Sequence, residues 1–86
     1  MDREAILGVL MDNMRALLAS GVPEVVREED SMTGTYGADS LEAVEVTSRT
    51  VTTLKKQGVK TPKASEFSSA QTIGDLVDIF ERAANA

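Results

Sequence analysis

The sequence predicts a small all-α domain, a bundle of three long helices and one short helix with a long first loop. Three observations lead to this prediction. Apolar residues recur at helical spacing in three segments, N-cap residues precede these segments, and glycine follows the first two. The 86 residues are expected to form one domain, residues 1–86. Only three residues are aromatic, so its core must be mostly aliphatic.

The first helix is expected to run from Arg3 to Ala19 or Ser20. Asp2 is a suitable N-cap, and Gly21 supplies a C-terminal stop. The apolar residues between them follow a helical period and should face the core: Ile6, Val9, Leu10, Met14, Leu17 and Leu18.

A long connection follows, over residues 21–38. A connection of this length usually signals function or disorder. We expect an ordered loop, because apolar residues can pin it to the helices: Val25, Val26, Met32 and Tyr36. The charged run from Arg27 to Asp30 is interpreted as a solvated surface.

The second helix is expected from Asp39 or Ser40 to about Lys56, after a turn at Gly37. Asp39 and Glu42 are spaced as a capping box. The segment is rich in β-branched residues, but it is too long for a strand and does not alternate cleanly. Two apolar stripes lie on different faces of this helix. One contains Ala43, Val46, Thr47, Thr50 and Leu54, and the other contains Leu41, Val44, Ser48 and Val51.

The last part of the chain should hold a short helical turn and a third long helix. The turn is expected around residues 64–69, with Phe67 facing inward. Thr72 is the predicted N-cap of the last helix, and Asp75 completes a second capping box. Its apolar face comprises Ile73, Leu76, Val77, Phe80 and Ala84, and residues 83–86 should fray.

Composition excludes several kinds of chemistry. The chain has no cysteine and no histidine, which removes disulfides, thiolate metal sites and the usual general base. We therefore expect no metal site and no enzymatic activity. The formal net charge of -5 disfavours nucleic acid and anionic membrane and favours partners with basic patches. The chain shows no signal-peptide pattern and no membrane span, so we expect a cytoplasmic protein. We also expect it to be a monomer.

Ser40 is the candidate functional residue. At the first helical position, its hydroxyl lies at the positive end of the helix dipole, where a phosphate ester is favoured. Local chemistry alone favours an ordinary helix start, because short motifs often arise by chance.

The whole chain, however, resembles an acyl carrier protein. The resemblance rests on the long first loop, the short helix before the last one, the acidity, and the run Gly37-Ala38-Asp39-Ser40-Leu41-Glu42, which is close to the family's attachment motif. It implies that a phosphopantetheinyl transferase joins 4′-phosphopantetheine from coenzyme A to Ser40. Acyl groups would then be carried as thioesters on the arm's thiol, so that the reactive sulfur is imported with the prosthetic group.

The resemblance also implies roles for the neighbouring residues. Asp39 would shape the helix start and help the transferase to recognise the site. Leu41, Val44 and Val51 would form the exposed contact stripe, with Glu42 and Glu45 meeting basic patches on partners. The other stripe would then face inward: Ala43, Val46, Thr50 and Leu54.

The chain departs from the family pattern at two places, and the second departure favours a specialised pathway. Tyr36 stands where a leucine commonly precedes the glycine, and the helix has no acidic residue from Arg49 to Lys56. The chain resembles the freestanding donor carriers of polyketide β-branching cassettes, which receive malonyl and supply acetyl. Its expected partners are therefore an acyltransferase, a ketosynthase or a hydroxymethylglutaryl-synthase-like enzyme. This likeness lies in Glu45 to Thr50, Thr61-Pro62, Glu66-Phe67, Ala70, and Ile73 to Phe80.

Other functions stay open. A carrier of fatty-acid synthesis is one alternative. An aminoacyl or peptidyl carrier is another, although those carriers often have a second glycine or a histidine before the serine, where this chain has Ala38-Asp39. A more remote alternative is an unmodified helical adaptor that binds a partner through Leu41, Val44 and Val51.

Overall fold

The computed structural model describes all 86 residues and is entirely helical, with three α-helices and no strand. Helix α1 spans Arg3–Leu17, α2 spans Ser40–Lys56 and α3 spans Ile73–Ala84. A single 3-10 turn, η1, spans Ala64–Phe67 between α2 and α3. The predicted all-α class is therefore confirmed. None of the helices combines the length and the apolar character needed to cross a lipid bilayer.

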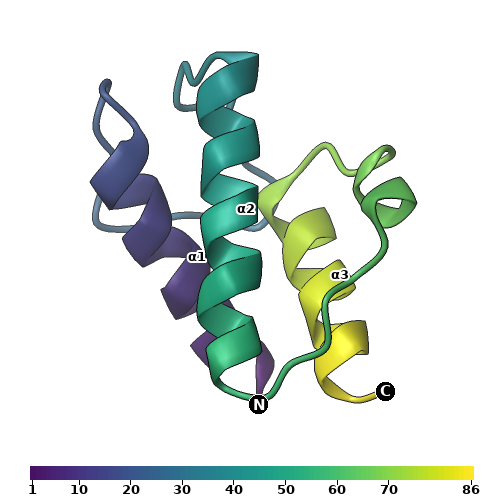
Figure 1. Ribbon diagram of the computed structural model, residues 1–86. Helices are drawn as coiled ribbons and strands as arrows, with labels where there is room; N and C mark the ends of the chain where they lie inside the picture. Colours follow the sequence, from purple (N-terminus) through teal and green to yellow (C-terminus); the bar gives the residue numbers. More distant parts are fainter.

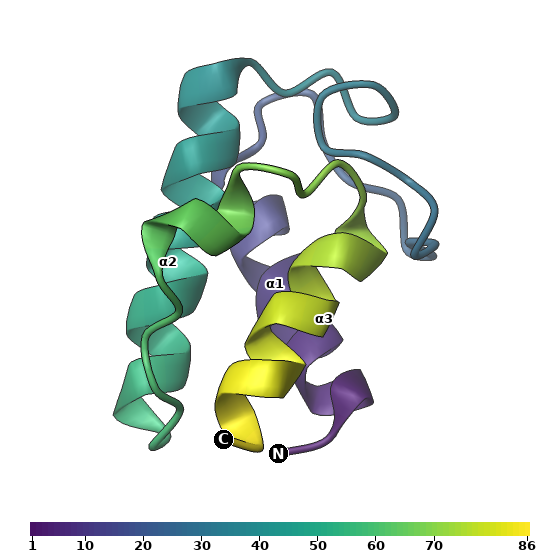
Figure 2. The same ribbon diagram turned by 90° about the vertical axis from the view of Figure 1, so that its right-hand side faces the viewer.

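Figure 1 shows the three helices, of which α1 packs against both others, whereas α2 and α3 do not pack directly on each other. No Cα atom of α2 lies within 8 Å of a Cα atom of α3. Figure 2 shows α1 behind the space between them, and the connection that carries η1 in front of it. Both chain termini lie at one end of the bundle, and α2 begins at the other end.

Helix α1 begins as predicted but ends earlier. The Asp2 carboxylate accepts a hydrogen bond from the amide of Ala5 at 2.8 Å. The helix stops at Leu17, before the predicted end at residue 19 or 20, because Leu18 turns to an extended backbone and buries its side chain in the core. Gly21, with φ at 83°, instead closes a separate turn by donating its amide to the carbonyl of Leu18 at 3.1 Å.

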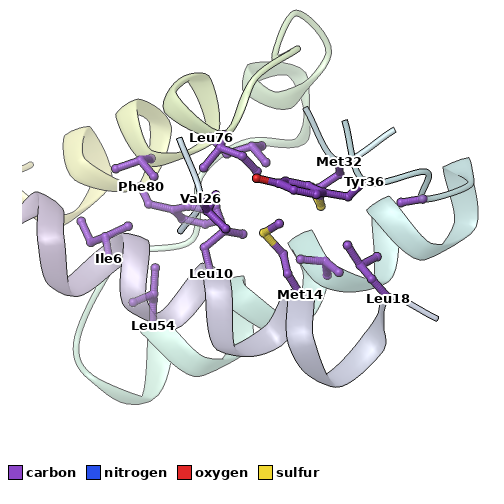
Figure 3. Close-up of a cluster of buried hydrophobic side chains, with 14 of the residues drawn as sticks. Ile6, Leu10, Met14, Leu18, Val26, Met32, Tyr36, Leu54, Leu76 and Phe80 are labelled. Carbon is purple, nitrogen blue, oxygen red and sulfur yellow. The ribbon is translucent and has the colours of Figure 1, made fainter. Parts of the chain in front are cut away.

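The core is aliphatic except for one tyrosine and one phenylalanine. Figure 3 shows the Tyr36 ring beside Met32, between Met14 of α1 and Leu76 of α3. Phe80 is fully buried. Its ring centroid lies 5.6 Å from that of Phe67 on η1, a contact range in which aromatic pairs attract.

One polar contact lies inside the α1–α2 interface. The buried Asn13 side chain donates to the hydroxyl of Thr50 at 3.0 Å, and that hydroxyl donates to the carbonyl of Val46 at 2.8 Å. Each polar group therefore has a partner, as burial requires. The pair fixes how the two helices align.

The long loop is ordered by contacts with α3. The amides of Ile73 and Gly74 donate to the carbonyls of Asp30 and Glu28, each at 2.8 Å. These bonds satisfy two of the amides that a helix start leaves without partners. The sequence predicted that the charged run forms only a solvated surface. Its backbone carbonyls in addition bind the first amides of α3.

The side chains of the loop follow the expectation with one exception. Val26, Met32 and Tyr36 are buried as predicted, but Val25 is 73 % exposed, so the expectation for Val25 was wrong. Its neighbour Val26 takes the inward position, and Val25 is left facing solvent.

Arg3 joins the start of α1 to two distant segments. Its guanidinium pairs with Glu28 of the loop at 2.5 Å, and with Asp78 and Glu81 of α3 at 2.6 and 3.3 Å. The ion pair holds the pKa of the Glu28 carboxyl below its ordinary value. Because these groups are partly exposed, the cluster serves more to align three segments than to supply a large free energy.

Candidate functional site

The predicted capping box forms at the start of α2. An Asp39 oxygen accepts from the amide of Glu42 at 2.7 Å, and Glu42 Oε1 accepts from the amide of Asp39 at 3.1 Å. Ser40 is the first helical residue, and it is exposed. Its hydroxyl makes no hydrogen bond within the chain and is presented to solvent at the positive end of the helix dipole.

The residues before Ser40 are held by the loop. Gly37 adopts a φ of 70°, in the left-handed region that favours glycine. The buried Ala38 donates its amide to the carbonyl of Met32 at 2.9 Å, and the carbonyl of Tyr36 accepts from the hydroxyl of Ser20. The approach to Ser40 is therefore tied to the turn that follows α1 and to the loop.

Tyr36 adds a further tie through its hydroxyl. The hydroxyl donates to the carboxylate of Asp30, which also accepts from the amide of Arg27 at 2.9 Å. Burial of the ring, together with the bond to Asp30, raises the pKa of Tyr36 to about 12, and the same bond lowers the pKa of Asp30. Asp30 thus connects Tyr36 to the start of α3, because its carbonyl accepts from Ile73.

Glu42 has a second role that sequence reasoning missed. Its Oε2 accepts from the amide of Ala19 at 3.2 Å, just beyond α1. Both carboxylate oxygens are thus used within the chain. Glu45, one turn further, is exposed and makes no such bond. No spacing rule predicts the Ala19 contact, since it joins residues brought together only by the fold.

The predicted contact stripe divides into two parts. Leu41 and Val44 are 68 % and 61 % exposed, whereas Val51 is half-buried and packs against the core. The expected exposure of Val51 is therefore wrong, because its side chain packs against the buried core cluster. The predicted inward stripe fits better: Val46, Thr50 and Leu54 are buried, and Ala43 is half-buried.

A groove of about 880 Å³ opens between α2 and α3, and sequence reasoning did not predict it. Val44, the residue one turn beyond Ser40, lies on its wall. Its lining is largely apolar and comes from α2, the loop, the connection and α3, including Met32, Val44, Val51, Phe67, Ile73 and Leu76. The second apolar stripe of α2 was the sequence signal for this surface.

The Ser40 hydroxyl has no side-chain partner, and free backbone amides lie beside it. Ser40 has no base within hydrogen-bonding distance, and no cluster of three or more acidic side chains could hold a metal ion. The amides of Ser40 and Leu41 have no partner in the chain, because they precede the first intrahelical bond, from Ala43 to Asp39. Free amides beside an exposed hydroxyl suit a phosphate ester.

No protein-family model, no curated protein and no solved structure matches this sequence.

Proposed function

We propose that the protein is an acyl carrier, in which Ser40 receives 4′-phosphopantetheine from coenzyme A through a phosphopantetheinyl transferase. The observation that carries the proposal is the exposed, unengaged hydroxyl at the capped start of α2. The bundle of three helices with a 3-10 turn before the last one is compatible with the acyl-carrier arrangement expected from the sequence.

The residues around Ser40 fit such a group. The Ser40 oxygen would form the phosphodiester, and the unpartnered amides of Ser40 and Leu41 would face its phosphate. Asp39 keeps the helix start in shape without occupying those two amides. When attached, the arm supplies a thiol that carries acyl groups as thioesters.

The groove supports the same function. It reaches Val44, one turn from Ser40, and its apolar lining would offer an acyl cargo a surface shielded from water. Leu41 and Val44 would remain accessible to the enzymes that use the carrier.

The test is an intact-mass measurement after incubation with coenzyme A and a broad-specificity transferase. Wild type and Ser48→Ala, a matched control in which an exposed serine of α2 is removed, should each gain one phosphopantetheine mass. Ser40→Ala should gain none while keeping the helical circular dichroism of wild type. Unmodified wild type beside a fully modified reference carrier would refute the proposal and favour an unmodified adaptor.

For the pathway, we propose polyketide biosynthesis, with the protein as a malonyl or acetyl donor for β-branching. Its partners would be an acyltransferase, a ketosynthase or a hydroxymethylglutaryl-synthase-like enzyme. The support is that no acidic residue lies between Arg49 and Lys56. A partner that binds an acidic stripe would therefore find few contacts on this half of α2. Loading the holo-protein with malonyl, acetyl and aminoacyl donors tests this, since efficient aminoacyl loading would indicate a peptidyl carrier.

A further inference from the structure

The basic residues are concentrated in one part of this acidic chain. Five of its nine lysines and arginines lie between Glu45 and Glu66, a segment with no acidic residue. The rest of the chain carries fourteen acidic and four basic residues. We call these five residues the basic segment: Arg49, Lys55, Lys56, Lys60 and Lys63.

The side chains of the basic segment form no ion pair inside the molecule. All five side chains are exposed, and the ion pairs of the chain involve only Arg3 and Arg15 as cations. Glu66, the next acidic residue, accepts from the backbone amide of Lys63 at 2.8 Å and forms no ion pair. Five positive charges therefore remain free to act on a partner.

The helix dipole explains only part of this pattern. Lys55 and Lys56 lie in the last turn of α2, where cations are favoured. Arg49 lies about two turns earlier, and Lys60 and Lys63 lie beyond the helix. Stabilising α2 would not require these three residues, and α1 and α3 each have a single basic residue in the last turn.

The sign of the charge changes along the exposed side of α2. Its first half carries the exposed Leu41, Val44 and Glu45, and its second half carries Arg49, Lys55 and Lys56. Lys55 and Lys56 lie ten and eleven residues beyond Glu45, a rise of about 15 Å that exceeds a Debye length of about 8 Å, whereas Arg49 lies only one turn from Glu45. Each region can therefore act on a different area of a partner.

We propose that the basic segment docks onto an acidic patch of a partner protein. A nucleic acid or an anionic membrane presents negative charge over an extended surface, which would also face the acidic remainder of this molecule of 33 × 25 × 21 Å. A protein can match a local positive area with a local negative one. This docking does not require Ser40 to be modified.

The proposal is tested by titrating the isotope-labelled protein with a glutamate-rich peptide. Binding is followed by nuclear magnetic resonance, through the chemical shifts of the protein's amides. We expect the shifts to concentrate on residues 49–63, and a glutamine-rich peptide to cause none. Lys55→Glu with Lys56→Glu should weaken binding about tenfold. The control is Arg27→Glu with Arg82→Glu, which makes the same change in net charge at two exposed arginines that form no ion pair. It should weaken peptide binding less than about twofold.

Three results would overturn the proposal. The first is shifts that avoid the basic segment, and the second is an equal loss of affinity in the two double variants. The third is tighter binding to phosphatidylglycerol vesicles or to an oligonucleotide than to the glutamate-rich peptide, which would assign the segment to another class of partner. Ser40→Ala should bind the peptide as wild type does, so failure of the proposed modification would leave this result unchanged.

Discussion

Replacing Gly74 by alanine tests whether α3 is seated on the loop as closely as the structure shows. A Cβ atom at this position would lie 3.1 Å from Cβ of Glu28 and 3.2 Å from its carbonyl oxygen. That carbonyl is already fixed by the amide of Gly74 at 2.8 Å, and the Glu28 side chain is paired with Arg3. Overpacking typically costs about 1–3 kcal/mol. The better helix propensity of alanine returns at most about 1 kcal/mol.

The expected net effect is a loss of about 1–2 kcal/mol in the free energy of unfolding. For a domain of this size, the melting temperature should fall by roughly 5–15 °C. Thermal and urea unfolding, followed by circular dichroism, would measure both quantities.

Gly8 provides the matched control. It lies within α1, it is exposed, and a Cβ there would meet nothing within 4 Å. Gly8→Ala should therefore stabilise the protein by about 0.5–1 kcal/mol. If Gly74→Ala stabilised the protein as much as Gly8→Ala does, the close contact between α3 and the loop would be refuted.

Three further experiments test the burial and hydrogen bonding of individual side chains. Phe80→Ala should lower the free energy of unfolding by about 3–5 kcal/mol, because the ring is fully buried. Leu41→Ala should change it by less than about 0.5 kcal/mol. A large loss for Leu41→Ala in urea unfolding would contradict the exposed position of Leu41. Thr50→Val should lower the free energy of unfolding by about 1–3 kcal/mol, because the Asn13 amide loses its acceptor. Thr50→Ser should recover part of that loss. Equal stability of the two variants would count against the hydrogen bond between Asn13 and Thr50. The pKa of Tyr36, the only tyrosine, is raised to about 12. The protonated Tyr36 hydroxyl therefore contributes fully to the free energy of unfolding below about pH 10, and this contribution is lost as pH rises toward 12. An absorbance titration that gave a midpoint near 10 in the folded protein would disprove this.

Local interactions could be predicted from the sequence, and those that depend on the fold could not. The capping boxes at Asp39 and Thr72 join residues three positions apart, so their spacing was sufficient. The end of α1 was misplaced because the burial of Leu18 outweighed the stop signal at Gly21. A turn residue marks where a helix can end, but packing decides where it does end.

The candidate site shows the same division. The position of Ser40 at the helix start follows from its neighbours in the chain. The Ala19–Glu42 bond and the docking of α3 on the carbonyls of Glu28 and Asp30 join distant segments, and no periodicity predicts them. Val51 was placed on the exposed stripe by the family resemblance, because periodicity alone could not tell the two stripes apart, but its side chain packs against the core.

The placement of α3 against α1 has a consequence for synthesis on the ribosome. Residues 73–80 supply much of the interior, and Asp78 and Glu81 supply two of the partners of Arg3. A nascent chain that has emerged only as far as α2 can align its first two helices but has no residues to cover the other side of α1. Stable folding must therefore wait until the last helix has left the ribosome, long after Ser40 has emerged. An enzyme that requires the folded site would meet it only once α3 has emerged.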